Sequence, residues 1–121
     1  MPRKVLIVDD SVTMRQMVSF TLREAKFDVV EAENGADALK KLKAFAPDLI
    51  VTDLNMPVMD GLTLIRSARA LPPTRYIPIL MLTTENQPEK KAEAKAAGAT
   101  GWIVKPFNPP NLLAVIAKVL P

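Results

Sequence analysis

The sequence predicts an α/β fold, a doubly wound parallel sheet of five strands with five helices. Five short apolar runs alternate along the chain with five segments of helical periodicity, which is the pattern of such folds. The first, third and fourth runs are apolar nearly throughout, as strands covered on both faces by helices must be. At this length, residues 1–121 are expected to form one domain.

The apolar runs mark the expected strands. In chain order these are Lys4–Val8, Asp28–Ala32, Leu49–Thr52, Ile79–Thr83 and residues 102–104.

Helical periodicity and capping residues place a helix after each strand. In chain order the helices run from Ser11 as N-cap to about Ala25, from Asn34-Gly35 to Phe45, over about residues 62–70 up to Pro72-Pro73, over Pro88–Ala97, and from Asn108 as N-cap with Pro109 next to it through Leu120. The fourth differs, because its only apolar residues are alanines, and Gly98 ends it. Alanines remove little apolar area from water, so we expect this helix to be the least firmly held.

The composition excludes several kinds of site. Without cysteine the chain has no disulfide or thiolate metal site, and without histidine it has no Ser/His/Asp triad, histidine-ligated zinc or phosphohistidine. The net charge of +3 is mild and the lysines have acidic neighbours, so no nucleic-acid surface is predicted. With no signal-peptide pattern and no apolar stretch of membrane-spanning length, we expect a cytoplasmic protein without membrane contact.

Polar side chains stand where the strands should end. Asp9 and Asp10 follow the first strand, Asp53 follows the third and Lys105 the fifth, while Thr83 ends the fourth. In open α/β sheets, ligands bind outside the carboxyl ends of the strands, where the strand order reverses; for the order 2-1-3-4-5 that point lies between the first and third strands. We therefore expect these side chains on one rim of the sheet.

The residue types on this rim predict phosphoryl-transfer chemistry. Buried carboxylates are unfavourable without a cation or hydrogen bonds, so three that converge imply a bound metal ion. Oxygen ligands without nitrogen or sulfur suit Mg²⁺, with Mn²⁺ as the alternative. A carboxylate beside a divalent ion, a lysine and a hydroxyl can act as a nucleophile and form an aspartyl phosphate.

Taken singly, the same residues have simpler interpretations. Asp53 could cap a neighbouring helix, Thr83 could be an ordinary β-branched strand residue, and Lys105 could be a surface lysine. Their common position at strand ends favours a shared pocket instead.

Four segments resemble the receiver domains of two-component response regulators, most closely the single-domain chemotaxis regulators. They are residues 8–11, 53–61, 82–84 and 104–107. The resemblance covers the whole chain and implies a flavodoxin-like fold with the strand order 2-1-3-4-5. It implies a phosphorylation-controlled signalling module that catalyses only its own phosphorylation and dephosphorylation.

The resemblance assigns roles by position. It makes Asp53 the phosphoacceptor, Asp9 and Asp10 organisers of Mg²⁺, Asn55 a metal ligand through its backbone carbonyl, Thr83 and Lys105 contacts of the phosphoryl oxygens, and Asn55 and Glu85 neighbours of the hydrolytic water that tune dephosphorylation. The family also has a cis peptide before the proline that matches Pro106.

For output, the family uses the face made by the fourth helix, the fifth strand and the fifth helix. The candidate switch and surface residues are Thr83, Trp102, Lys91, Lys95, Ala99, Val104 and Lys118. Trp102 stands where the family has a Tyr or Phe whose rotamer follows the threonine. It is either a passive core residue or a switch whose inward rotation is limited by its bulk.

The expected partners are proteins. The resemblance implies a CheA-like histidine kinase as phosphodonor, a target such as the flagellar motor switch or a phosphorelay protein, and a phosphatase. The chain itself is expected to be a monomer.

Two other functions are weaker alternatives. An Asp-nucleophile phosphatase for small phosphate esters would need a second Asp where Asn55 stands, and a substrate-covering cap for which no residues remain. A flavin carrier would need a hydroxyl-rich phosphate loop after the first strand, where Asp9 and Asp10 stand instead.

Overall fold

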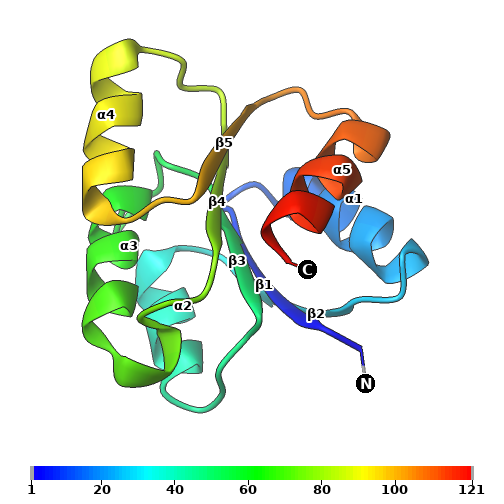
Figure 1. Ribbon diagram of the computed structural model, residues 1–121, viewed down its shortest axis with the longest axis horizontal. Helices are drawn as coiled ribbons and strands as arrows, with labels where there is room; N and C mark the ends of the chain where they lie inside the picture. Colours follow the sequence, from blue (N-terminus) through cyan, green and yellow to red (C-terminus); the bar gives the residue numbers. More distant parts are fainter. Residues whose placement is uncertain (1, 121) are drawn as a thin grey trace.

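The computed structural model describes residues 2–120 and shows one sheet between two layers of helices (Figure 1). The strands are β1 (Lys4–Val8), β2 (Asp28–Ala32), β3 (Leu49–Thr52), β4 (Ile79–Thr83) and β5 (Gly101–Val104). The helices are α1 (Val12–Glu24), α2 (Gly35–Leu42), α3 (Gly61–Ala70), α4 (Pro88–Ala97) and α5 (Pro109–Val119), with a 3-10 turn at Pro72–Thr74. The predicted α/β class is confirmed. Within residues 2–120, no helix has the length and apolar character needed to cross a membrane.

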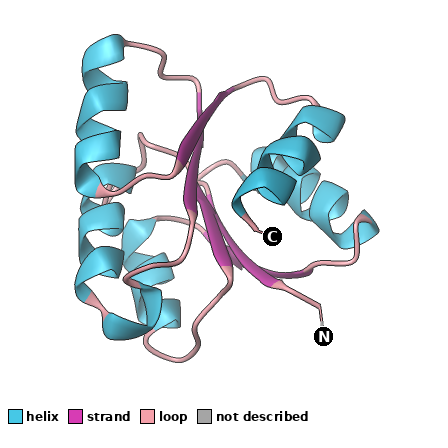
Figure 2. Ribbon diagram, viewed as in Figure 1, coloured by secondary structure: helices cyan, strands magenta, loops and turns pink. Residues whose placement is uncertain are grey.

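The strands pair in parallel in the order β2-β1-β3-β4-β5, as predicted (Figure 1). Figure 2 shows the strands in magenta between the helices in cyan. Three backbone hydrogen bonds extend the pairing one residue past the strand ends: Asp9 N–H to Ala32 O (3.2 Å), Asp53 N–H to Val8 O (2.9 Å) and Lys105 N–H to Thr83 O (2.8 Å). The backbones of these site residues are therefore fixed to the rim of the sheet.

Alternate side chains of the central strands enter two cores. Leu6 and Ile50 pack with residues of α2, α3 and α4, whereas Ile7 and Val51 pack with residues of α1 and α5. Figure 1 shows the two helix layers on opposite sides of the sheet. Because both faces are covered, the central strands have no solvent side, which accounts for their nearly continuous apolar sequences.

The predicted N-caps of α1 and α5 are confirmed. The Ser11 hydroxyl accepts a hydrogen bond from the Met14 N–H at 3.2 Å, and the Asn108 side chain accepts one from the Asn111 N–H at 3.0 Å. Each cap satisfies an N–H that has no partner within its own helix.

The second helix is shorter than predicted. It ends at Leu42, and Phe45 lies beyond it, half-buried against the core. The Phe45 N–H still donates to the Lys41 carbonyl at 3.2 Å. Pro47 has no N–H to donate to the carbonyl of Lys43, so the helix does not continue beyond this turn. The apolar spacing of Phe45 with Leu42 reflects packing of the following turn.

The fourth helix has the predicted bounds and a small core contact. Ala94 is its only buried residue, and its N-cap, Gln87, makes no capping hydrogen bond with its side chain. Gly98 ends the helix with a left-handed φ of 116°, which favours glycine. That α4 is the least firmly held helix stays a prediction.

Candidate functional site

Three carboxylates converge at the carboxyl edge of the sheet. Asp9 and Asp10 follow β1 and Asp53 follows the neighbouring strand β3, so that one oxygen of each lies within 4.8 Å of the others. Asp9 and Asp53 are buried, at 3% and 8% exposed, whereas Asp10 is exposed. The predicted convergence is confirmed, and the exposed Asp10 leaves the cluster accessible to solvent.

Lys105 reaches into this cluster from the end of β5. Its Nζ donates to Asp9 Oδ2 at 2.7 Å and to Asp53 Oδ2 at 3.1 Å, with only 9% of the side chain exposed. The peptide bond between Lys105 and Pro106 is cis, as the family resemblance implied. Lys105 is therefore a pocket residue, as its place at a strand end predicts, and the alternative of a surface lysine is excluded.

Burial and pairing act against each other at this ion pair. Burial raises the pKa of Asp9 above its ordinary value, because the hydrogen bonds from Lys105 and Ser11 only partly compensate for lost hydration. Burial alone would lower the pKa of Lys105, but the hydrogen bond to Asp9 and the charges of Asp53 and Asp9 together raise it. The lysine is thus held as a cation between two carboxylates.

Backbone donors orient the two buried carboxylates. The Ser11 N–H donates to Asp9 Oδ1 at 2.9 Å, and the Leu54 N–H donates to Asp53 Oδ1 at 2.7 Å. In both residues the second oxygen accepts from Lys105. Each buried carboxylate therefore has both oxygens engaged and a defined orientation.

The cluster fits a hard divalent cation. All three side chains offer carboxylate oxygens, and one lysine ammonium does not neutralise three carboxylates. Such a donor set suits Mg²⁺, which prefers oxygen ligands and usually keeps several waters. Asn55 lies exposed in the loop after β3, and its role as a carbonyl ligand stays a prediction.

Thr83 and Trp102 both contact the backbone of Glu85. The Glu85 N–H donates to the Thr83 hydroxyl at 3.3 Å, and the indole Nε1–H of Trp102 donates to the Glu85 carbonyl at 3.1 Å. Thr83 is fully buried at the end of β4. A change at the Thr83 hydroxyl can therefore reach Trp102 through one residue, a connection that the sequence pattern did not reveal.

Arg15 is a site residue that the sequence interpretation missed. Its Nη1 donates to the backbone carbonyl of Asp9 at 2.7 Å, and its Nε lies 3.4 Å from Glu31 Oε1. One signal was available in the sequence. A cation near the start of α1 is disfavoured by the helix dipole, which indicates anionic or carbonyl groups close by.

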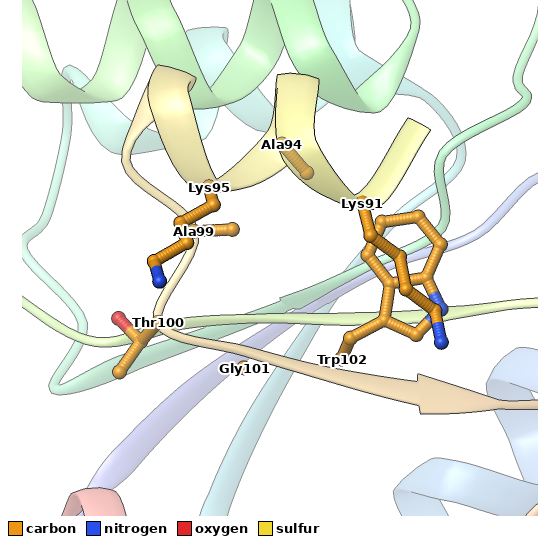
Figure 3. Close-up of a pocket in the computed structure, with 7 residues that line it drawn as sticks. All are labelled: Lys91, Ala94, Lys95, Ala99, Thr100, Gly101 and Trp102. Carbon is orange, nitrogen blue, oxygen red and sulfur yellow. The ribbon is translucent and has the colours of Figure 1, made fainter. Parts of the chain in front are cut away.

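Four of the predicted output residues, Lys91, Lys95, Ala99 and Trp102, line one pocket. A shallow pocket of about 280 Å³ between α4 and β5 is lined by Lys91, Ala94, Lys95, Ala99, Thr100, Gly101 and Trp102 (Figure 3). The Lys91 ammonium lies 6.0 Å from the centroid of the Trp102 ring. Val104 and Lys118 are exposed but do not line this pocket.

Comparison with known proteins agrees with this geometry. A family model described as the response regulator receiver domain matches residues 5–117. Chemotaxis protein CheY-3 of Vibrio cholerae is 43% identical over 117 residues, covering 96% of this chain and 90% of that protein. Chemotaxis protein CheY1 of Helicobacter pylori is 44% identical over 119 residues, covering 97% and 96%.

Solved structures of related proteins have the same fold as this chain. The crystal structure of chemotaxis protein CheY4 of Vibrio cholerae superposes with a TM-score of 0.96 at 51% identity, covering 99% of this chain and 100% of that one. With the matching family model and two curated relatives above 40% identity, fold and sequence point to one family. The chain belongs to the response regulator receiver domains, and its relatives among them include CheY chemotaxis proteins.

Proposed function

We propose that this chain is a phosphoacceptor switch, in which a histidine kinase transfers a phosphoryl group to Asp53 in the presence of Mg²⁺. CheY-like receiver domains take phosphate from histidine kinases and act on downstream targets. The observation that carries the proposal is the Asp53 carboxylate, buried among Asp9 and Asp10 and 3.1 Å from the Lys105 ammonium. Phosphoryl transfer depends mainly on positioning and charge neutralisation, and this arrangement favours both.

The metal ligands would be the side chains of Asp9, Asp10 and Asp53 and the backbone carbonyl of Asn55. Mn²⁺ accepts the same oxygen ligands and is the alternative ion. When bound, the ion supplies positive charge beside the oxygens of the incoming phosphoryl group.

The nucleophile is an oxygen of the Asp53 carboxylate. It forms an O–P bond while the N–P bond of the donor phosphohistidine breaks and the imidazole leaves with the electron pair. The Leu54 N–H holds the carboxylate in a fixed orientation. Lys105 already lies within hydrogen-bond distance of Asp53, and its ammonium would pair with the negative oxygens of the new aspartyl phosphate.

The switch would run from Thr83 to Trp102. The phosphoryl group adds negative charge and acceptor oxygens at the end of β3, and the Thr83 hydroxyl would turn to donate to them. That rotation would withdraw the acceptor from the Glu85 N–H, and the Glu85 peptide in turn carries the hydrogen bond to the indole of Trp102. Phosphorylation would thus change the position of Trp102 in the α4–β5 pocket.

The output would be contact with another protein at the face of α4, β5 and α5. Lys91 and Lys95 give the pocket positive charge, and Trp102 gives it an aromatic wall, which suits an acidic partner segment with an apolar side chain. We propose a CheA-like kinase as donor, with the flagellar motor switch or a phosphorelay protein as target. The chain would catalyse only its own phosphorylation and dephosphorylation.

A labelling experiment tests the proposal. The protein is incubated with acetyl phosphate and Mg²⁺, and intact-mass spectrometry should detect one added phosphoryl group that Asp53→Asn abolishes. Asp28→Asn is the matched control, because Asp28 is an exposed aspartate at the start of β2, away from the carboxyl edge of the sheet. Equal labelling of wild type and Asp53→Asn would refute the assignment of Asp53.

A further inference from the structure

The guanidinium of Arg15 lies behind the carboxylate cluster and contacts its backbone. Nη1 donates to the Asp9 carbonyl at 2.7 Å, while Nε lies 3.4 Å from Glu31 Oε1 on β2. Only 15% of the Arg15 side chain is exposed. The Arg15 guanidinium thus connects α1 with β2 and with Asp9, the residue that follows β1.

The carbonyl that Arg15 binds belongs to the peptide joining Asp9 to Asp10. The preceding peptide is also fixed, because the Asp9 N–H donates to Ala32 O at 3.2 Å. Displacement of the Asp9–Asp10 peptide would carry the Cα atoms of both residues with it, and so both carboxylates. Arg15 is therefore placed to fix the position of two adjacent carboxylates.

A cation at this position has an electrostatic disadvantage that Glu31 removes. An uncompensated guanidinium near the cluster would repel a divalent ion, and the positive end of the α1 dipole adds to the repulsion. The Glu31 carboxylate lies against Arg15 and offsets its charge, while the hydrogen bond from Arg15 to the Asp9 carbonyl remains. Glu31 also lies 3.8 Å from Arg23, an exposed residue about two helical turns beyond Arg15 on α1.

We propose that Arg15 is a positioning residue for the metal site and that Glu31 is its counter-ion. The pair holds the Asp9–Asp10 backbone in the position that lets both carboxylates bind one divalent cation. Groups that orient metal ligands typically change metal affinity by 10- to 100-fold when they are removed. This inference rests on the proposed function, because it takes the three carboxylates as the Mg²⁺ site.

The test is calorimetric titration of the purified chain with Mg²⁺ alone. Arg15→Met, which keeps the apolar stem, should raise the dissociation constant about 10-fold. Arg15→Lys keeps the charge but offers one ammonium in place of the planar guanidinium with its several N–H donors. It should give a dissociation constant between those of wild type and Arg15→Met. Arg23→Met is the matched control: it removes the other cation beside Glu31 without touching Asp9, and should leave the dissociation constant within about twofold of wild type.

The outcomes separate this inference from the proposed function. Wild type that does not bind Mg²⁺ would refute the metal site itself. If wild type binds Mg²⁺ and Arg15→Met leaves the dissociation constant unchanged, Arg15 is only structural, and its loss lowers the melting temperature alone. If Arg15→Met lowers the dissociation constant, Arg15 only repels the cation. Either result would overturn the role of Arg15 and leave the metal site standing. If Arg15→Met does not fold, Arg15→Lys decides, and a wild-type dissociation constant in that variant would overturn the inference.

Discussion

Lys105→Met removes the only cation that pairs with the buried carboxylates among the described residues, and it should destabilise the metal-free protein strongly. The ammonium lies 2.7 Å from Asp9 Oδ2 and 3.1 Å from Asp53 Oδ2, with 9% of its side chain exposed. Methionine keeps the apolar stem, so the main loss is the charge. Two buried carboxylates would then repel each other with no compensating cation between them.

The structure bounds the size of this effect. Removing one partner of a buried ion pair costs about 3–5 kcal/mol, and the opening beside the exposed Asp10 favours the lower end. The loss of stability has an upper limit, because one aspartate can take up a proton instead of remaining charged. Protonation at a pH about 3 units above an ordinary Asp pKa costs about 4 kcal/mol. We expect a loss of about 3 kcal/mol at neutral pH, or a melting temperature lower by about 12 °C.

The pH dependence follows from the sign of the Asp9 shift. Burial already raises the pKa of Asp9 in the folded protein, and loss of Lys105 would raise it further. An acid whose pKa is higher in the folded state than in the unfolded state loses its stabilising contribution as the pH rises through the folded value. The stability difference between Lys105→Met and wild type should therefore be largest at neutral pH and shrink as the pH is lowered.

Thermal unfolding followed by circular dichroism measures these changes, with Lys118→Met as an exposed-lysine control on α5. The control should stay within about 0.5 kcal/mol of wild type. Mg²⁺ at a hundredfold excess over the wild-type dissociation constant should stabilise wild type by about 2.7 kcal/mol. The same concentration should stabilise the variant more and narrow the gap, since the variant has no ammonium competing for the carboxylates and should bind Mg²⁺ more tightly. A variant that melts within about 2 °C of wild type at neutral pH would refute the reasoning.

Three further predictions concern the same site. Asp10→Asn should raise the metal-free melting temperature, because it relieves repulsion at the exposed Asp10 without breaking the Lys105 ion pairs. It should also abolish stabilisation by Mg²⁺, because one carboxylate of the cluster is lost, and thermal unfolding with and without Mg²⁺ checks both effects. Exchanging both Asn55 and Glu85 for apolar residues should lengthen the aspartyl-phosphate lifetime, and an unchanged decay rate of the intact-mass adduct would exclude them from water activation. Beryllofluoride with Mg²⁺ should alter Trp102 emission beyond the effect of Mg²⁺ alone, whereas Asp53→Asn should respond only to the metal; identical spectra with confirmed binding would make Trp102 a passive core residue.

The sequence was sufficient to predict the rim of the site because topology places strand ends together. Asp9, Asp53 and Lys105 each come directly after a strand, and parallel strands end at one edge. Apolar runs without a polar face also identified the central strands, since both of their faces are covered. These inferences needed only local patterns and one rule of topology.

The individual contacts could not be predicted in this way. Lys105 and Asp9 are 96 residues apart in the chain, and local patterns do not reveal which carboxylate lies closest to the ammonium. The unfavourable place of Arg15 near the start of α1 indicates a nearby acceptor but does not identify the Asp9 carbonyl as that acceptor. Phe45 fitted the helical period, but the missing N–H of Pro47 opposed a longer helix, and packing of the turn preserved the apolar spacing.

The two ends of α4 are held very differently, and this difference indicates where a signal would enter the helix. At the carboxyl end, Arg69 donates to the Gly98 carbonyl from Nη2 at 2.7 Å and from Nε at 3.2 Å, and it also donates to the Ile77 carbonyl. At the amino end, Gln87 provides no side-chain cap. The exposed N–H groups of Asn86 and Gln87 donate to the Glu85 carboxylate, and the Glu85 backbone connects this loop to Thr83 and Trp102. Elements that move in switching come from the weakly held parts of a fold. We therefore expect phosphorylation to displace the amino end of α4 while Gly98 stays fixed. Beryllofluoride should then change amide hydrogen exchange in residues 86–91 more than in residues 94–98. Equal changes at both ends would mean that the helix moves as a whole.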